Sequence, residues 1–244
     1  MSPVPETAMV LAAGLGTRMR PLTDDRPKAL VEVGGRPLID HMLDRLVEAG
    51  VKRAVVNVHA FADRLMDHLD QCTTPIIMIS DERDQKIPLE TGGGIKRSRI
   101  ELGEAPILVA NIDSVWLEGR EPPAEAIRAL CDRFDPTRET ARLMLARMER
   151  TSGFDGPGDF FMDEDDRLVP RRVNGAASAP LNYMGVHIVD PGPIYDHPET
   201  AFGLFPLWVK WAAGGRLAGQ VMDGDWMHVG DPEALKAAEA RLAR

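Results

Sequence analysis

The sequence contains little cysteine, no long apolar run and a deficit of positive charge. Its two cysteines, Cys72 and Cys131, match no metal-binding or disulfide-rich spacing, so we expect reduced thiols. No apolar run approaches the roughly 18 residues of a transmembrane helix. No basic segment precedes the first apolar run, as a signal peptide requires. These absences favour a cytoplasmic protein that does not bind membranes.

Acidic side chains outnumber basic ones. The 38 Asp and Glu residues exceed the 29 Lys and Arg residues, which gives a net charge of −9. A negatively charged surface of this kind repels the phosphate backbones of nucleic acids, which excludes nucleic acid as a general partner. The first four cations nevertheless fall close together, at Arg18, Arg20, Arg26 and Lys28. This basic cluster in an acidic chain indicates a local anion site.

The composition is that of a globular α/β protein. With 244 residues, 44% of them hydrophobic, the chain is long enough to bury a sizeable core. Its 22 glycines and 19 prolines indicate many turns, and no repeat or low-complexity segment interrupts them.

Short apolar runs alternate with amphipathic segments along the first half, as in βαβ units with a mostly parallel sheet. Continuous apolar runs predict buried strands, and helical spacing of apolar residues predicts helices. We expect strands at 9–13, 54–58, 76–79, 107–110, 141–148, 159–162 and 183–189, and helices at 38–47, 61–69, 94–102, 122–134, 204–213 and 232–242.

The strongest local signal is a glycine-rich turn after the first expected strand. It reads Leu11-Ala-Ala-Gly-Leu-Gly-Thr-Arg-Met-Arg-Pro-Leu-Thr23, and Arg26-Pro-Lys-Ala-Leu30 follows. Glycines allow backbone N–H groups to approach an anion closely, Arg18 offers a bidentate fork, and Lys28 a point charge. The alternative for Arg18 is a surface ion pair with Asp24 or Asp25.

Two familiar phosphate motifs do not fit this turn. It lacks the Gly-Lys-Ser/Thr of a Walker loop and the third glycine of a dinucleotide fingerprint, which argues against an NAD enzyme.

Taken together, these residues resemble the signature of the sugar-1-phosphate nucleotidylyltransferases, and the resemblance extends over almost the whole chain. It implies a GT-A-like fold, in which helices flank a Rossmann-like mixed sheet. It also implies that an NTP and a sugar 1-phosphate react to give a nucleotide sugar and pyrophosphate. We expect one domain over 1–244, with a nucleotide-binding half at 1–135 and a smaller sugar-acceptor half at 136–244.

The resemblance also assigns roles to individual residues. Arg18 and Lys28 become catalytic residues, Arg18 at the leaving phosphates and Lys28 between the α-phosphate and the incoming phosphate. The expected nucleotide-binding residues are Leu11, Ala12, Ala13, Gly14, Gly16, Thr17, Glu90, Gly92 and Gly93. The expected sugar-binding residues are Asn111, Gly158, Asn182, Tyr183 and Gly185.

Residues Leu89-Glu-Thr-Gly-Gly-Gly-Ile95 resemble the branch that includes the N-acetylmuramate-1-phosphate uridylyltransferases. UTP with an N-acetylmuramate-type sugar 1-phosphate is therefore expected ahead of GTP with mannose 1-phosphate. The glycines could instead form a flexible helix start. For the sugar phosphate, Arg171 and Arg172 are the nearest cationic candidates, although a solvated pair is as reasonable.

Asp113 is the first candidate metal ligand. It follows the expected strand at 107–110, and ligands of open α/β sheets gather at the carboxyl ends of strands. A carboxylate there suits Mg²⁺, with Mn²⁺ as the alternative, unless Asp113 only caps a loop.

The second expected metal carboxylate is missing. The family's W-V-D-V-G segment reads Trp226-Met-His-Val-Gly230 here, which places His228 where relatives have aspartate. Asp113 could bind the metal with the substrate phosphates alone, or His228, Asp225 or Asp231 could be a further ligand. Alternatively, the site is lost and the protein is a nucleotide-sugar-binding regulator. A monomer and a homodimer are both compatible with the sequence.

Overall fold

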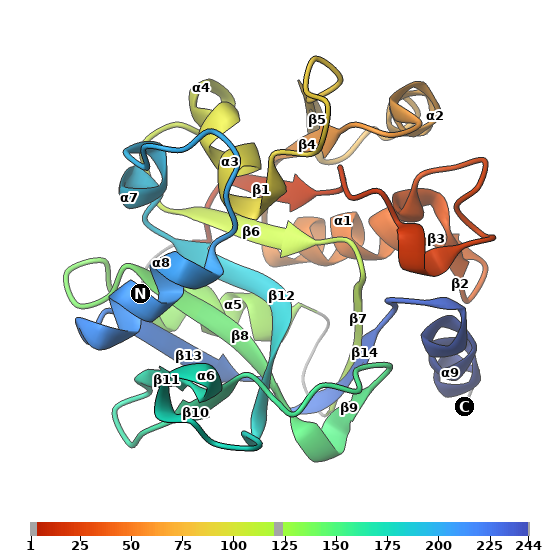
Figure 1. Cartoon of the computed structure of the whole chain (residues 1–244). Coiled ribbons are helices and arrows are strands. Elements are labelled where there is room, and N and C mark those ends of the chain that lie inside the picture. The colour runs from red at the N-terminus through yellow and green to blue at the C-terminus, as the bar shows by residue number, and fades with distance from the viewer. Residues whose placement is uncertain (1–3, 120–123, 244) are drawn as a thin grey trace.

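A mixed β-sheet forms the centre of the chain, which a computed structural model describes over residues 4–119 and 124–243 (Figure 1). The strands of this sheet are β1 (Thr7–Leu11), β4 (Arg53–Val58), β5 (Ile76–Asp81), β6 (Ile107–Asn111), β8 (Ala141–Arg147), β10 (Phe160–Met162), β11 (Leu168–Pro170), β12 (Leu181–Val189) and β13 (Leu217–Val221). Their order is β11-β10-β12-β6-β1-β4-β5, with β8 beside β12 and β13 beside β8.

The half predicted from sequence to bind nucleotide contains four neighbouring parallel strands of this sheet, and the other half contains the parallel pair β8 and β13. Strands β6, β1, β4 and β5 pair in parallel, whereas β12 runs antiparallel to both β6 and β8. The predicted fold class, a mixed and mostly parallel sheet flanked by helices, is confirmed.

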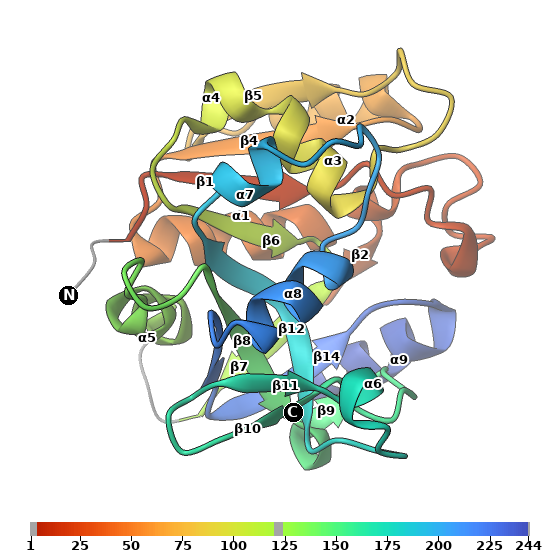
Figure 2. The same ribbon diagram turned by 60° about the vertical axis from the view of Figure 1, so that its left-hand side comes forward.

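Helices cover both faces of the sheet (Figure 2). Because side chains alternate along a strand, Ala8 and Val10 belong to one hydrophobic cluster and Met9 to the other. The first cluster includes residues of α1 (Leu38–Ala49), α2 (Ala62–Leu69), α5 (Glu125–Arg133) and α9 (Pro232–Leu242). The second includes residues of α3 (Glu90–Arg97), α4 (Arg99–Leu102), α7 (Gly192–Tyr195) and α8 (Phe205–Ala213). Among the described residues, no helix has the length and apolar character needed to cross a bilayer.

A small second sheet carries the C-terminal part of the chain back toward the end of β6. Its strands are β7 (Ser114–Glu118), β14 (Gly224–His228) and β9 (Thr151–Ser152), in the order β7-β14-β9. The remaining short elements are β2 (Glu32–Val33), β3 (Arg36–Pro37), α6 (Arg171–Asn174), η1 (Thr17–Met19), η2 (Lys28–Leu30) and η3 (Met148–Arg150). Antiparallel pairing of β14 with β7 sets His228 opposite Ser114, next to Asp113.

Most predicted bounds differ from the observed ones by one or two residues, and two predicted elements are divided or shifted as a whole. The segment expected as one helix at 94–102 is helical but divided, since α3 begins earlier, at Glu90, and α4 follows after Ser98. The glycines lie within α3 because close packing requires them: a Cβ on Gly92 would lie 2.3 Å from the Phe202 ring. The strand expected at 9–13 begins at Thr7 and ends at Leu11.

The structure also contains strands that were not expected from the sequence. Strands β7, β11, β13 and β14 were not predicted; Gly219 interrupts the apolar pattern of β13, and β14 begins with Gly224 and a polar Asp225. The helix expected at 122–134 is observed as α5, and its expected first two residues lie outside the described residues.

Candidate active site

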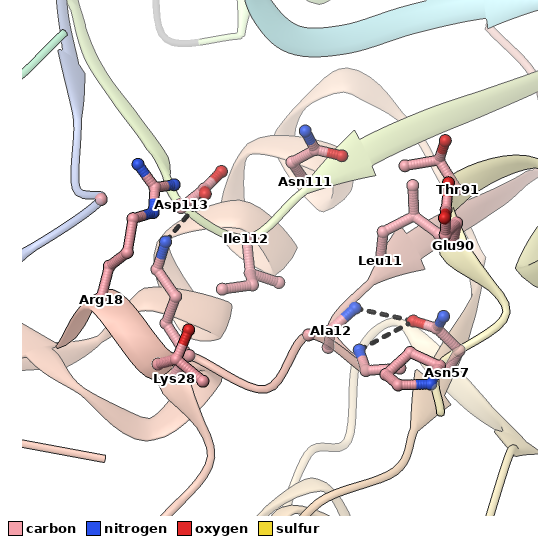
Figure 3. Close-up of a pocket in the computed structure, with 16 residues that line it drawn as sticks. Leu11, Ala12, Arg18, Lys28, Asn57, Glu90, Thr91, Asn111, Ile112 and Asp113 are labelled. Atoms are coloured by element: carbon pink, nitrogen blue, oxygen red, sulfur yellow. Dashed lines mark hydrogen bonds and ion pairs between the residues drawn. The ribbon is translucent and has the colours of Figure 1, made fainter. Parts of the chain in front are cut away.

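A cavity of about 320 Å³ lies where β1 and β6 end (Figure 3). Because these two strands are parallel neighbours, the segments that follow them meet at the same edge of the sheet. The cavity is lined by Leu11, Ala12, Ala13, Gly14, Gly16, Thr17, Arg18, Lys28, Asn57, Pro88, Glu90, Thr91, Asn111, Ile112, Asp113 and Gly230. Its size falls within the range of ligand pockets.

The glycine-rich turn forms one wall of this cavity. Gly16 has a φ of +62°, and a Cβ there would lie 3.1 Å from Thr23 Cγ2 and 3.2 Å from Lys28 Cβ. The Thr23 hydroxyl donates a 2.8 Å hydrogen bond to the Gly16 carbonyl, which fixes the turn. A Cβ on Gly14, by contrast, would meet nothing within 4 Å. The turn therefore combines a fixed backbone with open space in front of it.

Lys28 and Asp113 form an ion pair at the cavity, although 85 positions separate them in sequence. Lys28 Nζ donates a 2.8 Å hydrogen bond to Asp113 Oδ2. Burial acts to raise the pKa of Asp113, but the charges of Lys28 and His228 and the lysine hydrogen bond outweigh it, so the pKa is lowered. The carboxylate is therefore ionised at neutral pH, ready to bind a cation.

Arg18 is the second cation at the cavity. The sequence left open a surface ion pair between Arg18 and Asp24 or Asp25. In the structure, Asp24 pairs with Arg20, and Asp25 pairs with Arg26 and Arg64. Among the described ion pairs Arg18 has none, so the surface-pair alternative is wrong. Figure 3 shows its guanidinium beside the Lys28–Asp113 pair.

His228 lies at the edge of the same site. The Val229 N–H donates a 2.9 Å hydrogen bond to the Asp113 carbonyl, which places the His228 Nδ1 atom 4.0 Å from Asp113 Oδ2. Desolvation lowers the pKa of His228, and although Asp113 acts to raise it, Lys28 and Arg18 reinforce the lowering. The imidazole is therefore neutral at neutral pH, which is the form that binds metals.

The two carboxylates considered as assistants have other partners. Asp225 pairs with Arg150 and Arg241, and Asp231 caps α9 by accepting hydrogen bonds from the Glu233 and Ala234 N–H groups. Neither lines the cavity.

The opposite wall consists of residues 88–91, where Glu90 has an unusual backbone. Its φ of +63° lies in the left-handed region that non-glycine residues rarely adopt, and such strain costs roughly 1–3 kcal/mol. Strained residues gather at ligand sites, and Glu90 lines the cavity as predicted from sequence. Gly92 and Gly93 do not line the cavity. Their N–H groups donate to the Phe202 carbonyl, so nucleotide binding by these two glycines stays a prediction.

Most of the expected sugar-binding residues lie outside the cavity, and only Asn111 lines it. A Cβ on Gly185 would lie 3.1 Å from Asn111 Cβ, and one on Gly158 would lie 2.1 Å from the Ala179 carbonyl. Asn182 is fully buried and donates to Met148 Sδ and Thr151 Oγ1. The sugar-binding roles of Gly158, Asn182 and Gly185 therefore stay predictions.

Tyr183 and His187 form a polar pair inside the second hydrophobic cluster. The Tyr183 hydroxyl lies 2.6 Å from His187 Nδ1, and the ring of Trp208 packs edge-on against both. Burial, with a contribution from Asp113, raises the pKa of Tyr183 well above its usual value. Burial also lowers the pKa of His187 to about 3. The tyrosine therefore donates to a neutral imidazole.

The candidate cations for the sugar phosphate do not reach the cavity. Arg171 donates to the Gly158 and Ala176 carbonyls, and Arg172 lies over the Phe205 ring at 5.3 Å. Both arginines thus have local contacts that explain their positions.

The structure adds lining residues that sequence reasoning missed: Asn57, Pro88, Thr91, Ile112 and Gly230. One signal was present, because Asn57 interrupts an otherwise apolar strand at 54–58. Gly230 is also missing from the sequence-based set, and the structure shows why a glycine stands there: a Cβ would lie 2.7 Å from His228 Nε2.

A second group of potential metal ligands lies apart from this cavity, at Asp40, His68 and Cys72, whose ligand atoms are all within 4.8 Å of one another. An ordinary hydrogen-bond contact, with 2.7 Å between His68 Nε2 and Asp40 Oδ1, accounts for two of them. Burial raises the pKa of the Cys72 thiol, and Asp40 and Asp44 raise it further. Because metals bind the thiolate, Asp113 is the stronger candidate ligand.

Comparison with known proteins gives a consistent result. Residues 8–157 match the family model described as a MobA-like NTP transferase domain. The N-acetylmuramate alpha-1-phosphate uridylyltransferase of Caulobacter vibrioides is 54% identical, across 100% of this chain and 99% of its own length. The enzyme of the same name from Neisseria meningitidis is 34% identical, across 96% of both chains. The inositol-1-phosphate CTP transferase of T. maritima shares the fold, with a TM-score of 0.76 at 19% identity, over 98% of this chain and 96% of that one.

The buried His187 imidazole predicts a pH-dependent stability. Its folded-state pKa of about 3 lies below the ordinary 6.5, so the unfolded chain binds the extra proton. The stability is complete above about pH 6.5 and falls with decreasing pH, by up to about 1.4 kcal/mol per pH unit. Urea unfolding at pH 7 and pH 5 should show about 2 kcal/mol more loss in the wild type than in His187→Gln. Equal losses in both proteins would contradict this.

Proposed function

This chain belongs to the sugar-1-phosphate nucleotidylyltransferases of the MobA-like NTP transferase family, and on that premise we propose that it uridylylates an N-acetylmuramate-type sugar 1-phosphate. An oxygen of the sugar phosphate attacks the α-phosphorus of UTP, and the bond to the departing pyrophosphate breaks. The 54% identity to a uridylyltransferase, across the whole chain, supports UTP over GTP with mannose 1-phosphate.

The arrangement of charges in the cavity suits this reaction. Both reactants are anions, so the site must align them and offset their charge. The observation that carries the proposal is the Lys28 ammonium group, fixed 2.8 Å from Asp113 beside the glycine-rich turn. We assign Lys28 to the α-phosphate and Arg18 to the leaving phosphates. A regulator that only binds nucleotide sugars would not require Arg18, Lys28 and Asp113 together.

The donor atoms beside Lys28 also fit a divalent cation. Asp113 Oδ2 and His228 Nδ1 are 4.0 Å apart, within reach of one ion with bonds of about 2.1 Å. We propose that Asp113 holds Mg²⁺ or Mn²⁺ together with substrate phosphates, and that His228 is an additional ligand. When bound, such an ion would offset phosphate charge. We also propose that Asn111, at the end of β6, binds the sugar phosphate, because it lines the cavity and the other expected sugar-binding residues do not.

A matrix of NTPs and sugar 1-phosphates tests the function. Pyrophosphate release is measured for UTP, GTP, CTP and ATP against the 1-phosphates of N-acetylmuramate, mannose and glucose, with Mg²⁺ present. We expect the highest kcat/KM for UTP with N-acetylmuramate 1-phosphate. A maximum for GTP with mannose 1-phosphate would overturn the substrate assignment. Tight nucleotide-sugar binding without product from any pair would favour the regulator.

His228 predicts a distinctive metal preference. Imidazole favours Mn²⁺ over Mg²⁺ more than carboxylate does. We expect His228→Asp to lower the ratio of the Mn²⁺-supported rate to the Mg²⁺-supported rate, measured by metal titration of both proteins. His228→Asn serves as a control, because it removes the imidazole without adding charge. If all three proteins respond identically to both metals, His228 is not a ligand.

A further inference from the structure

A buried polar pair, Asn57 at the end of β4 and Glu82 just after β5, connects the two walls of the cavity. Asn57 Oδ1 accepts hydrogen bonds from the N–H groups of Ala12 at 2.7 Å and Ala13 at 3.2 Å (Figure 3). Asn57 Nδ2 donates to Glu82 Oε1 at 2.8 Å, and Glu82 Oε2 accepts from the Leu89 N–H at 3.0 Å. The chain of bonds thus runs from the glycine-rich turn to the residue that precedes Glu90.

The direction of every bond in this chain is fixed. The backbone N–H groups at both ends can only donate, so an acceptor must face each of them. Asn57 therefore turns its oxygen to the turn and its amide nitrogen to Glu82, which uses one carboxylate oxygen for each partner. Asn57 is 3% exposed and Glu82 is 0% exposed, so water cannot replace a lost partner.

Glu82 makes no ion pair among the described residues. A buried polar side chain costs free energy unless it is hydrogen-bonded, and Glu82 uses both of its oxygens in this way. The function visible here is to accept two hydrogen bonds from two different parts of the site.

Helix α3 packs directly on the pair. A Cβ on Gly94 would lie 3.0 Å from Asn57 Nδ2 and 3.1 Å from Glu82 Oε1. The same helix begins at Glu90, whose left-handed backbone follows the residue that Glu82 holds. Asn57 and Glu82 therefore support the strained corner of one wall and the start of the opposite one.

We propose that Asn57 and Glu82 are positioning residues, which set the glycine-rich turn and residues 89–91 at the separation that nucleotide binding requires. Asn57 lines the cavity, but its amide oxygen and one amide N–H already bond to protein, so we assign its effect to the positions of Ala12 and Ala13. The inference rests on the proposed function, since it assumes that these two walls hold the nucleotide.

Two nearly isosteric substitutions test the pair. Glu82→Gln replaces one of the two acceptor oxygens with an amide NH₂ group. This NH₂ group must then face a donor, either Asn57 Nδ2 or the Leu89 N–H. Asn57→Asp keeps the acceptor for the turn but sets a second carboxylate against Glu82. The double variant, Asn57→Asp with Glu82→Gln, restores every bond with the middle one reversed. The new carboxylate at position 57 accepts from the new amide at position 82, and the oxygen of that amide accepts from the Leu89 N–H.

We expect each single variant to raise the KM for UTP about tenfold or more, which is the size of a lost buried hydrogen bond. The KM for the sugar 1-phosphate should change less, and the double variant should return to within about threefold of the wild type. Ser80→Ala is the matched control, because it removes the buried 2.9 Å bond from Ser98 Oγ to Ser80 Oγ, at the far end of α3. It should lower the unfolding free energy without changing the KM for UTP.

Two results would overturn the pair's role: single variants with a wild-type KM for UTP, or a double variant as impaired as the singles combined. UTP affinity measured by calorimetry on the wild type, both single variants and the double variant separates this inference from the proposed function. If wild-type protein turns over no substrate pair, the function fails. If UTP binds weakly to both single variants and at near wild-type affinity to the double variant, the positioning role of Asn57 and Glu82 is still supported. If the double variant does not recover UTP affinity, the positioning role is overturned.

Discussion

The ion pair between Lys28 and Asp113 is the contact on which the active site depends. It joins a segment that follows the first strand to the end of β6, and it can form only because β1 and β6 are neighbours in the sheet. Parallel strands bring their carboxyl ends to one edge, so a lysine and an aspartate 85 positions apart become partners. The small sheet β7-β14-β9 starts from the same point and brings His228 to the pair.

Around this pair, the glycine-rich turn and the corner at Glu90 line the cavity. The Ala12 and Leu89 N–H groups in these two segments donate to the buried side chains of Asn57 and Glu82. The two cations at the cavity, Arg18 and Lys28, suit an anionic ligand, because charges held in place offset ligand charge without reorganisation.

The sequence was sufficient to predict the parts of the site that depend on local pattern. Gly14, Gly16, Arg18 and Lys28 lie in one segment with the spacing of a phosphate turn, and Asp113 follows a recognisable buried strand. Asn57 was missed because a single asparagine in an apolar strand gives no indication of which distant N–H groups it will bind. Gly92 and Gly93 were assigned to the nucleotide from the family resemblance alone. Their contact with Phe202, about 110 positions away, is set by tertiary packing that no local pattern indicates.

The exchange of Lys28 for alanine tests the central claim most directly, that this ammonium group stabilises charge on the phosphates as they react. The account predicts that Lys28→Ala folds normally by circular dichroism but loses about 10²–10³ in kcat for pyrophosphate release, as when one preorganised donor is removed. Lys52→Ala, which removes an exposed ion pair with Glu6, provides the matched control and should keep full activity. A folded Lys28→Ala protein with a near-normal kcat would contradict the account.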